Sequence, residues 1–273
     1  MSSIRLTLTK APALRVDLRG VTPAACTGLA LAQIERLPVT HGNQTLVLAD
    51  FFDVTLHEGD DSLVFDGDLA RFDRVGWQLA GGRIVVNGSV GDHAGGCMSG
   101  GTLHVHGHAG ALAACEMAGG TLVVEGDVGD FAAGTLPGSM DGMRGGHLIV
   151  KGRAGERFGD RMRRGTALVF GDAGDFLASR MVAGTIAIGG AVGAHVGCGM
   201  RRGSVVFAGD AAQRPRVPPT FVPALADADV MWQLLARDLA RHGGPFATLA
   251  SRRTVRHLGD VSAGGKGELV FAL

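Results

Sequence analysis

The sequence predicts an all-β fold dominated by a right-handed parallel β-helix of about seven 19-residue turns, with a cap before it and a helix-containing extension after it. A glycine-rich unit repeats in register over more than a hundred residues, which a low-complexity linker would not do. Glycine accounts for 45 of 273 residues, more than twice the usual ~7%. Each unit also ends in an alternating [LIV]-x-[VI] segment, which is typical of a short strand.

The N-terminal region, residues 1–66, does not repeat and is predicted to cap the β-helix. Residues 4–9 and 14–18 alternate like strands, and Thr22 before Pro23 is typical of the start of a helix, which we expect to reach about Arg36. Residues 46–48 and 53–56 are further strand candidates that we expect to form the first coil. A cap is needed because the end rung of a β-helix exposes unpaired backbone groups.

The β-helix is assigned to residues 67–210 from the pattern G-x-[VA]-G-x-x-x-[GA]-x-x-M-x-x-G-x-[LIVA]-x-[VI]-x. A degenerate copy covers 69–87, and the later units begin at Gly88, Gly107, Gly126, Gly152, Gly171, Gly190 and Gly209. The step is 19 residues except after Gly126, where seven extra residues around 136–142 have the composition of a surface loop.

Methionine occupies the eleventh position of six successive units, so the turns should stack it into an interior column. Equivalent residues of neighbouring turns would lie roughly 4.8 Å apart. We expect the glycines to mark corners, where positive φ favours a residue without Cβ. The column comprises Met98, Met117, Met143, Met162, Met181 and Met200.

The C-terminal extension, residues 211–273, begins with a proline-rich stretch and then predicts one amphipathic helix from Asp229 to about His242. This helix would either seal the last turn or dock on a partner subunit. Its expected apolar face consists of Val230, Met231, Leu234, Leu235 and Leu239.

Composition excludes several classes of function. Twenty-six basic and 26 acidic residues give zero formal net charge, which gives no sign of nucleic-acid binding. The N-terminus has no apolar signal region and no stretch approaches the ~20 apolar residues of a membrane span, so a cytoplasmic protein without a membrane partner is expected. Four scattered cysteines predict reduced thiols rather than a disulfide framework.

The motifs predict neither a catalytic residue nor a metal ligand. Neither a phosphate-binding loop nor a G-x-S-x-G elbow occurs. His104 and His106 have zinc-compatible spacing but should face outward without a further ligand. Cys97, Cys115 and Cys198 fall beside the methionine column and lack an evident histidine partner.

Arginine recurs at equivalent repeat positions, so several guanidinium groups should line one edge of the β-helix. A column of like charges is costly unless anions meet it. Arg161 and Arg180 flank these arginines. In one interpretation the arginines pair with Asp160, Asp172, Asp175 or water. In the other they form a groove for an acidic partner or for the anionic tail of a cofactor. The predicted binding residues are Arg144, Arg163, Arg164, Arg201 and Arg202.

The tandem units, together with Pro219-Thr-Phe221 and the ending Gly259-Asp-Val-Ser-Ala-Gly-Gly-Lys-Gly-Glu-Leu-Val270, resemble the C-subunit family of formylmethanofuran dehydrogenase. That family is similar to the glycine-repeat domain of the glutamate synthase large subunit. The resemblance covers residues from about 46 to the end, and the tail motif resembles that of the bacterial formyltransferase/hydrolase complexes.

The resemblance implies a non-catalytic structural subunit of a cytoplasmic four-subunit complex in one-carbon (formaldehyde) oxidation during methylotrophy. The complex would pass a formyl group from formyl-tetrahydromethanopterin to a methanofuran-type coenzyme, methylofuran, and hydrolyse it to formate. The partner subunits would be amidohydrolase-like, formyltransferase and molybdopterin-enzyme-like. These partners would carry the coenzyme and the metal, and this chain would carry no cofactor. The alternatives are the C subunit of a tungsten or molybdenum formylmethanofuran dehydrogenase, or a glutamate-synthase-like glycine-repeat domain.

Overall fold

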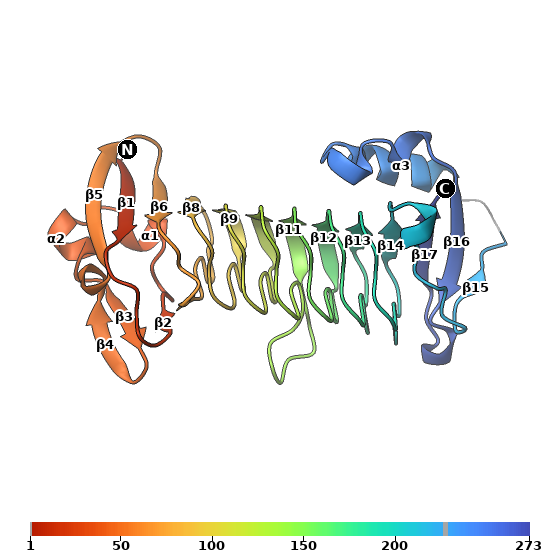
Figure 1. Cartoon of the computed structure of the whole chain (residues 1–273), viewed down its shortest axis with the longest axis horizontal. Coiled ribbons are helices and arrows are strands. Elements are labelled where there is room, and N and C mark those ends of the chain that lie inside the picture. The colour runs from red at the N-terminus through yellow and green to blue at the C-terminus, as the bar shows by residue number, and fades with distance from the viewer. Residues whose placement is uncertain (1, 226–228) are drawn as a thin grey trace.

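The computed structural model describes residues 2–225 and 229–273 and is dominated by strands (Figure 1). A 13-stranded, largely parallel sheet runs through the molecule in the order β15-β16-β17-β14-β13-β12-β11-β10-β9-β8-β6-β1-β5, and a four-stranded sheet, β4-β3-β2-β7, lies at the N-terminal end. The predicted all-β class is confirmed.

The central part is a row of 19-residue units, each of which we call a rung and name by its first glycine. Every rung contributes one strand to the large sheet, and these strands pair in parallel in sequence order. A second ladder of single bridges links Leu69, Val90, Ala109, Val128, Ala154, Ala173 and Val192. The strands are β8 (Arg83–Asn87), β9 (Ser99–Val105), β10 (Gly119–Val124), β11 (Arg144–Val150), β12 (Arg164–Val169), β13 (Thr185–Ile188) and β14 (Ser204–Phe207).

The methionine column lies in the core as predicted, because all six side chains have 0% exposure. The terminal methyl groups of Met117, Met143, Met162 and Met181 each pack under a glycine of the following rung. A Cβ added to Gly203, for example, would lie 2.8 Å from Cε of Met181. Gly203 also has φ +98°, so glycine is favoured there by both conformation and space.

The expected reason for the glycines that open each rung was wrong. These residues do not have positive φ; they are small because the preceding rung touches them. A Cβ on Gly190 would lie 2.3 Å from Oδ1 of Asp172. Conversely, bulky residues such as His93 (φ 63°) and Phe176 (φ 59°) adopt the left-handed conformation at the sixth position of their rungs.

Carboxylates at the second and fifth positions bridge successive rungs. Oδ1 of Asp175 accepts a hydrogen bond from N–H of Ala194, 19 residues later, at 2.8 Å, and Asp172 does the same for Ala191 at 2.7 Å. Because these acceptors satisfy backbone donors at the corners, they fix the register between rungs. Equivalent bonds are made by Asp73, Asp92, Asp127 and Asp130.

The N-terminal region differs from the prediction in two places. The expected helix from Thr22 to Arg36 is two short helices, α1 (Pro23–Cys26) and α2 (Leu31–Ile34), interrupted at Gly28, which has φ +76°. The expected first coil is not formed by residues 46–48 and 53–56, because β4 belongs to the smaller sheet and β5 pairs antiparallel with β1. The remaining elements are β1 (Ser2–Leu8), β2 (Val16–Asp17), β3 (Pro38–His41), β4 (Gln44–Val47), η1 (Leu48–Asp50), β5 (Phe52–Glu58), β6 (Ser62–Asp66) and β7 (Phe72–Asp73).

The predicted C-terminal helix is α3 (Asp229–Ala240), but only part of its expected apolar face, Leu235 and Leu239, packs against the core. Trp232, Ala236 and Leu239 are buried, whereas Val230 and Leu234 are 77% and 65% exposed. The indole of Trp232 donates to the carbonyl of Arg252, which orients the helix. The other elements are η2 (Ala211–Gln213), β15 (Val222–Pro223), η3 (Gly244–Phe246), η4 (Leu249–Ser251), β16 (Thr254–Gly259), η5 (Val261–Ala263) and β17 (Gly267–Ala272).

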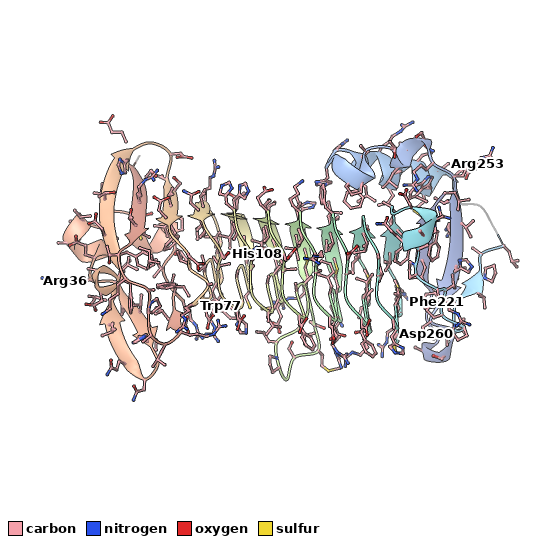
Figure 2. All side chains as sticks on the ribbon, viewed as in Figure 1. Arg36, Trp77, His108, Phe221, Arg253 and Asp260 are labelled. Carbon is pink, nitrogen blue, oxygen red and sulfur yellow. The ribbon has the colours of Figure 1, made fainter. Side chains whose placement is uncertain are left out.

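The glycine-rich tail closes the last rung. Strand β17 pairs in parallel with β14 and so extends the large sheet. A Cβ on Gly265 would lie 2.1 Å from the carbonyl oxygen of Met200, and Asp260, next to this contact, accepts from N–H of Gly199 at 3.0 Å. Phe221 lies at the same end of the molecule as Asp260 (Figure 2) and its ring covers Gly197. The tail motif therefore caps the stack.

Candidate functional site

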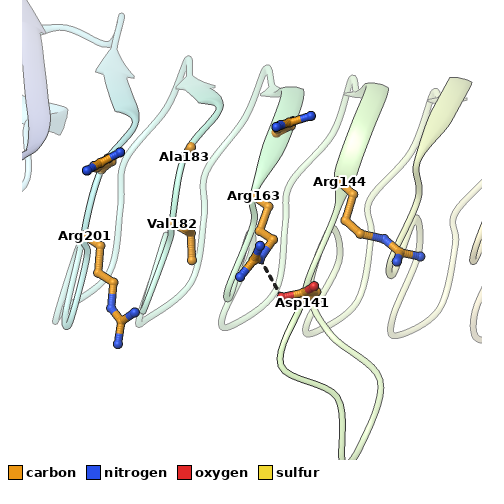
Figure 3. A pocket seen from close by; sticks show the side chains of 8 residues that line it. Asp141, Arg144, Arg163, Val182, Ala183 and Arg201 are labelled. Carbon is orange, nitrogen blue, oxygen red and sulfur yellow. Dashed lines mark ion pairs between the residues drawn. The ribbon is translucent and has the colours of Figure 1, made fainter.

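The five predicted arginines line one hollow of about 600 Å³ on the edge of the stack (Figure 3). We call Arg144, Arg163, Arg164, Arg201 and Arg202 the arginine edge. Its other lining residues are Asp141, Val182 and Ala183. The sequence repeat thus placed all five side chains in one site.

The repeat explains both the position and the shape of the hollow. N–H of Arg163 bonds to the carbonyl of Met143, and N–H of Arg201 to that of Met181, so the buried methionine column fixes where the arginines leave the core. The rung between them carries Val182 and Ala183 at the equivalent positions, as Figure 3 shows. Two pairs of arginines therefore face each other across one rung with small side chains, about 10 Å apart at the usual strand spacing.

The hollow is strongly cationic. Five guanidinium groups and one carboxylate, Asp141, leave a formal charge of +4 among the lining residues. Nε of Arg163 lies 2.5 Å from Oδ1 of Asp141, and Nη2 of Arg144 donates to the carbonyl of Glu116 at 3.4 Å. Within the described residues, the side chains of Arg164, Arg201 and Arg202 have no hydrogen-bond or ionic partner. Such a site favours a ligand or a protein surface with several carboxylates or phosphates.

Asp141 comes from the seven-residue insertion after Gly126, which the sequence assigned to a surface loop. Its neighbour Met140 is 67% exposed and contacts Nη1 of Arg161 through Sδ at 2.9 Å. N–H of Gly142 bonds to the carbonyl of Arg161, which anchors the end of the loop. Among the described residues, the insertion therefore supplies the one carboxylate that lines the hollow of the arginine edge.

A second hollow of about 450 Å³ adjoins the first and shares Arg163, Val182 and Arg201 with it. Arg161 and Arg180 lie on its wall. The charge of Arg180 is compensated, because its Nη2 and Nε donate to the buried Asp160 carboxylate at 2.6 Å and 3.0 Å. The two hollows form a continuous cationic strip across four rungs, those of Gly126, Gly152, Gly171 and Gly190.

The expected pairing of arginines with aspartates was correct for Asp160 only. Within the described chain, the carboxylates of Asp172 and Asp175 accept backbone hydrogen bonds from Ala191 and Ala194 and form no hydrogen bond or ion pair with an arginine side chain. They stand at the second and fifth positions of their rung, on the side where rungs are bridged. Repeat position, rather than nearness in sequence, decides the partner.

The histidines and cysteines singled out in the sequence form no comparable site. His104 and His106 face outward as expected; their rings stack at 4.3 Å, and Nε2 of His104 lies 2.8 Å from Oε1 of Glu125. No group of three potential metal ligands is present in residues 2–225 and 229–273. Burial raises the pKa of the Cys115 thiol to about 12, and that of Cys97 also lies above its usual value. Both thiols are therefore protonated at neutral pH.

The described helices are all too short or too polar to cross a bilayer. No family model matches the sequence.

Comparison with known proteins gives relatives over part of the sequence and over the whole structure. The C subunit of the formyltransferase/hydrolase complex Fhc from Methylorubrum extorquens is 46% identical over 77 residues, 28% of this chain and 29% of that protein. The C subunit of tungsten-containing formylmethanofuran dehydrogenase 2 from Methanothermobacter wolfeii is 32% identical over 99 residues, 35% of this chain and 37% of that protein. These aligned segments span about a third of the curated relatives.

The structural likeness is complete. A chain in the crystal structure of the formyltransferase/hydrolase complex FhcABCD from Methylorubrum extorquens, in complex with methylofuran, matches with a TM-score of 0.91 and 41% identity. The match covers 98% of this chain and 99% of that one. The fold and site define a subunit built on stacked glycine-rich rungs. Within that class, the chain belongs to the C-subunit family of the formyltransferase/hydrolase complex.

Proposed function

We propose that this chain is a non-catalytic structural subunit of a cytoplasmic formyltransferase/hydrolase complex. The observation that carries the proposal is the match at 41% identity over 98% of the chain to a chain of the FhcABCD complex. That match includes the N-terminal region and the C-terminal extension, which a glycine-repeat domain of the glutamate synthase kind does not explain. The lower identity of 32% to the tungsten enzyme's subunit makes a formylmethanofuran dehydrogenase the weaker alternative.

We also propose that the rung stack is a right-handed parallel β-helix. In each repeat the chain adds one strand to the large parallel sheet and one residue to the ladder of single bridges. A chain that returns to both ladders at each repeat winds around a closed core, which here contains the methionine column. Crossovers between parallel strands are right-handed in nearly all proteins, which favours that hand.

The proposed complex transfers a formyl group from formyl-tetrahydromethanopterin to methylofuran and hydrolyses it to formate. Its partners would be amidohydrolase-like, formyltransferase and molybdopterin-enzyme-like subunits, which would carry the metal and the coenzyme, with neither nucleic acid nor membrane as a partner. Two observations support a scaffolding role for this chain. Its thiols at Cys97 and Cys115 are protonated, and the cationic hollow contains guanidinium groups, which bind anions but do not exchange protons at neutral pH.

The arginine edge is proposed to bind carboxylates, either on the acidic tail of the methanofuran-type coenzyme or on a neighbouring subunit. An exposed ion pair contributes only ~0.2 to 1 kcal/mol. Several guanidinium groups in one hollow can act together on a polyanion, and their combined effect should weaken as salt screens it.

The assignment is tested by co-expressing the chain with the other three subunits. We expect the four proteins to elute together and release formate from formyl-tetrahydromethanopterin, and we expect the purified chain alone to release none. Formate release by the chain alone would contradict a non-catalytic role. Elution apart from the other three would contradict membership of the complex.

The role of the arginine edge is tested by changing Arg163, Arg164, Arg201 and Arg202 to Gln in the complex. The matched control changes four exposed arginines outside the hollow, Arg36, Arg153, Arg237 and Arg241, to Gln. Loss of coenzyme from an intact complex supports binding of the tail, and loss of assembly supports a subunit interface. If coenzyme content and assembly match the control at low and high salt, the arginine edge has neither role.

A second variant separates shape from charge. Val182→Phe fills the floor between the two pairs of arginines and leaves every charge in place. We expect it to lower ligand retention as the Gln variants do if the anion enters the hollow. Unchanged retention would indicate that the ligand lies over the rim.

A further inference from the structure

The outward face of the large sheet carries one column of residues that is apolar for almost its whole length. Strand pairing aligns Val64, Val85, His104, Val123, Ile149, Leu168, Ala187, Val206 and Val270 in consecutive strands from β6 to β17. The neighbouring outward columns are mainly polar in the N-terminal half of the stack, with Arg83, Thr102, Thr121 and His147 on one side. The column is thus an apolar stripe with a polar rim, which is the composition of a protein interface.

Helix α3 covers the C-terminal half of this stripe. Leu168, Ala187, Val206 and Val270 are at most 1% exposed and form a separate core with Trp232, Ala236 and Leu239 of α3. Figure 1 shows α3 lying along the row of strands at this end. The chain therefore contains one example of how the stripe is buried: by a helix that packs residues spaced four and three apart against successive strands.

The N-terminal half of the same stripe has no such cover among the described residues. Val64, Val85, His104 and Val123 remain partly exposed, and Ile149 marks the boundary where packing against the α3 core begins. Four strand steps separate β6 from β11, about 19 Å at the usual spacing. A helix of 12 residues, the length of α3, is about 18 Å long. The exposed half is therefore as long as the half that α3 covers.

We propose that the stripe formed by Val64, Val85, His104, Val123 and Ile149 is the docking surface for an amphipathic helix of another subunit, and this proposal rests on the proposed membership of the complex. The occupying helix extends the α3 interface along the same column. Its apolar residues recur with the spacing of Trp232, Ala236 and Leu239.

The sequence of α3 favours this partner over a second copy of the chain. The exposed face of α3 carries Val230 and Leu234, but the next residue at the same spacing is Arg237. A second copy would therefore place a guanidinium group on the apolar stripe, and burial of an unpaired charge opposes association. The rim itself carries both signs of charge, because Asp60, Asp66 and Glu125 stand beside the exposed half as well as Arg83 and Lys151.

The surface is tested in the co-expressed complex with an affinity tag on a partner subunit. The variant combines Val85→Lys with Val123→Lys, and the matched control combines Thr102→Lys with Thr121→Lys in the adjacent polar column. All four side chains point outward, so each lysine can reach water in the free chain. We expect the first variant to be recovered with the tagged partner at least tenfold less than wild type, and the control to be recovered like wild type.

The remaining outcomes also decide the question. Equal recovery of both variants, with wild type assembling, overturns the docking surface but leaves membership of the complex intact. A self-dimer of the purified chain that Val123→Lys abolishes assigns the surface to a second copy and overturns the proposal. If the lysine variant does not fold by circular dichroism, p-benzoylphenylalanine at position 123 replaces it. A photo-crosslink to a helical segment of another subunit supports the proposal, and crosslinks confined to copies of this chain overturn it.

Discussion

Replacing Met181 by aspartate probes the packing of the methionine column. The side chain has 0% exposure, and its methyl group sits where a Cβ on Gly203 would lie 2.8 Å away. The introduced aspartate would bury a carboxylate without a partner, which costs about 3 to 5 kcal/mol. Since a domain is stable by only about 5 to 15 kcal/mol, this is roughly a fifth or more of the total. Met181→Leu keeps the apolar character and should cost less than about 1.5 kcal/mol.

The chain contains its own control in Met140, which is 67% exposed on the inserted loop. Met140→Asp and Met140→Leu should each change the free energy of unfolding by less than about 0.5 kcal/mol. Urea unfolding followed by circular dichroism gives the midpoints of all four variants. Equal midpoints for Met181→Asp and Met181→Leu would refute the inward register of the eleventh position.

Two further predictions concern titratable groups. Burial raises the pKa of the Cys115 thiol to about 12. Iodoacetamide at pH 8 should therefore label the exposed Cys198 and leave Cys115 unlabelled until the chain is unfolded, as read by mass spectrometry. Rapid labelling of Cys115 in the native protein would contradict its burial. Burial alone would raise the pKa of Asp260, but hydrogen bonds from Ser262 and from N–H of Gly199 outweigh it and hold the pKa below its usual value. Because the pKa is lower in the folded state, the stabilisation is complete above the unfolded pKa of about 4 and is lost as the pH falls below it. The melting temperature of Asp260→Asn should therefore be lower than that of wild type at pH 7, and the difference between the two melting temperatures should narrow in acid. A difference that does not change with pH would show that the carboxylate charge is not involved.

The repeat period made the central stack and its methionine column predictable, because a fixed step superimposes equivalent residues whatever the details of each corner. The same step placed Arg163 and Arg201 in one hollow. It also indicated that the insertion carrying Asp141 would be a loop. The contact between Asp141 and Arg163 was not predictable, since the path of an inserted loop depends on contacts with the folded edge.

Other features depended on tertiary contacts that no local pattern contains. The α3 face was misassigned at Val230 and Leu234 because Leu234 fits an apolar helical pattern as well as Trp232 does, and only the position of the sheet decides which side is buried. Gly28 divides a segment that otherwise has a helix start at Thr22. The opening glycines, such as Gly190, are required by the preceding rung, which lies 19 residues away.

The carboxylates that bridge rungs determine how freely the number of repeats can change. Asp92 accepts from a main-chain N–H, which every residue except proline offers at that position. Removal of residues 107–125 would bring N–H of Asp130 opposite Asp92, and the bond would form again.

Asp160 is different, because it binds the side chains of Ser179 and Arg180. Removal of residues 171–189 would place Cys198 and Gly199 opposite Asp160 and leave its buried carboxylate without a side-chain partner. The stack is therefore modular before the inserted loop and fixed in length beside the arginine edge. Evolution can add or remove single rungs ahead of the loop while the cationic strip stays at a constant distance from the C-terminal cap.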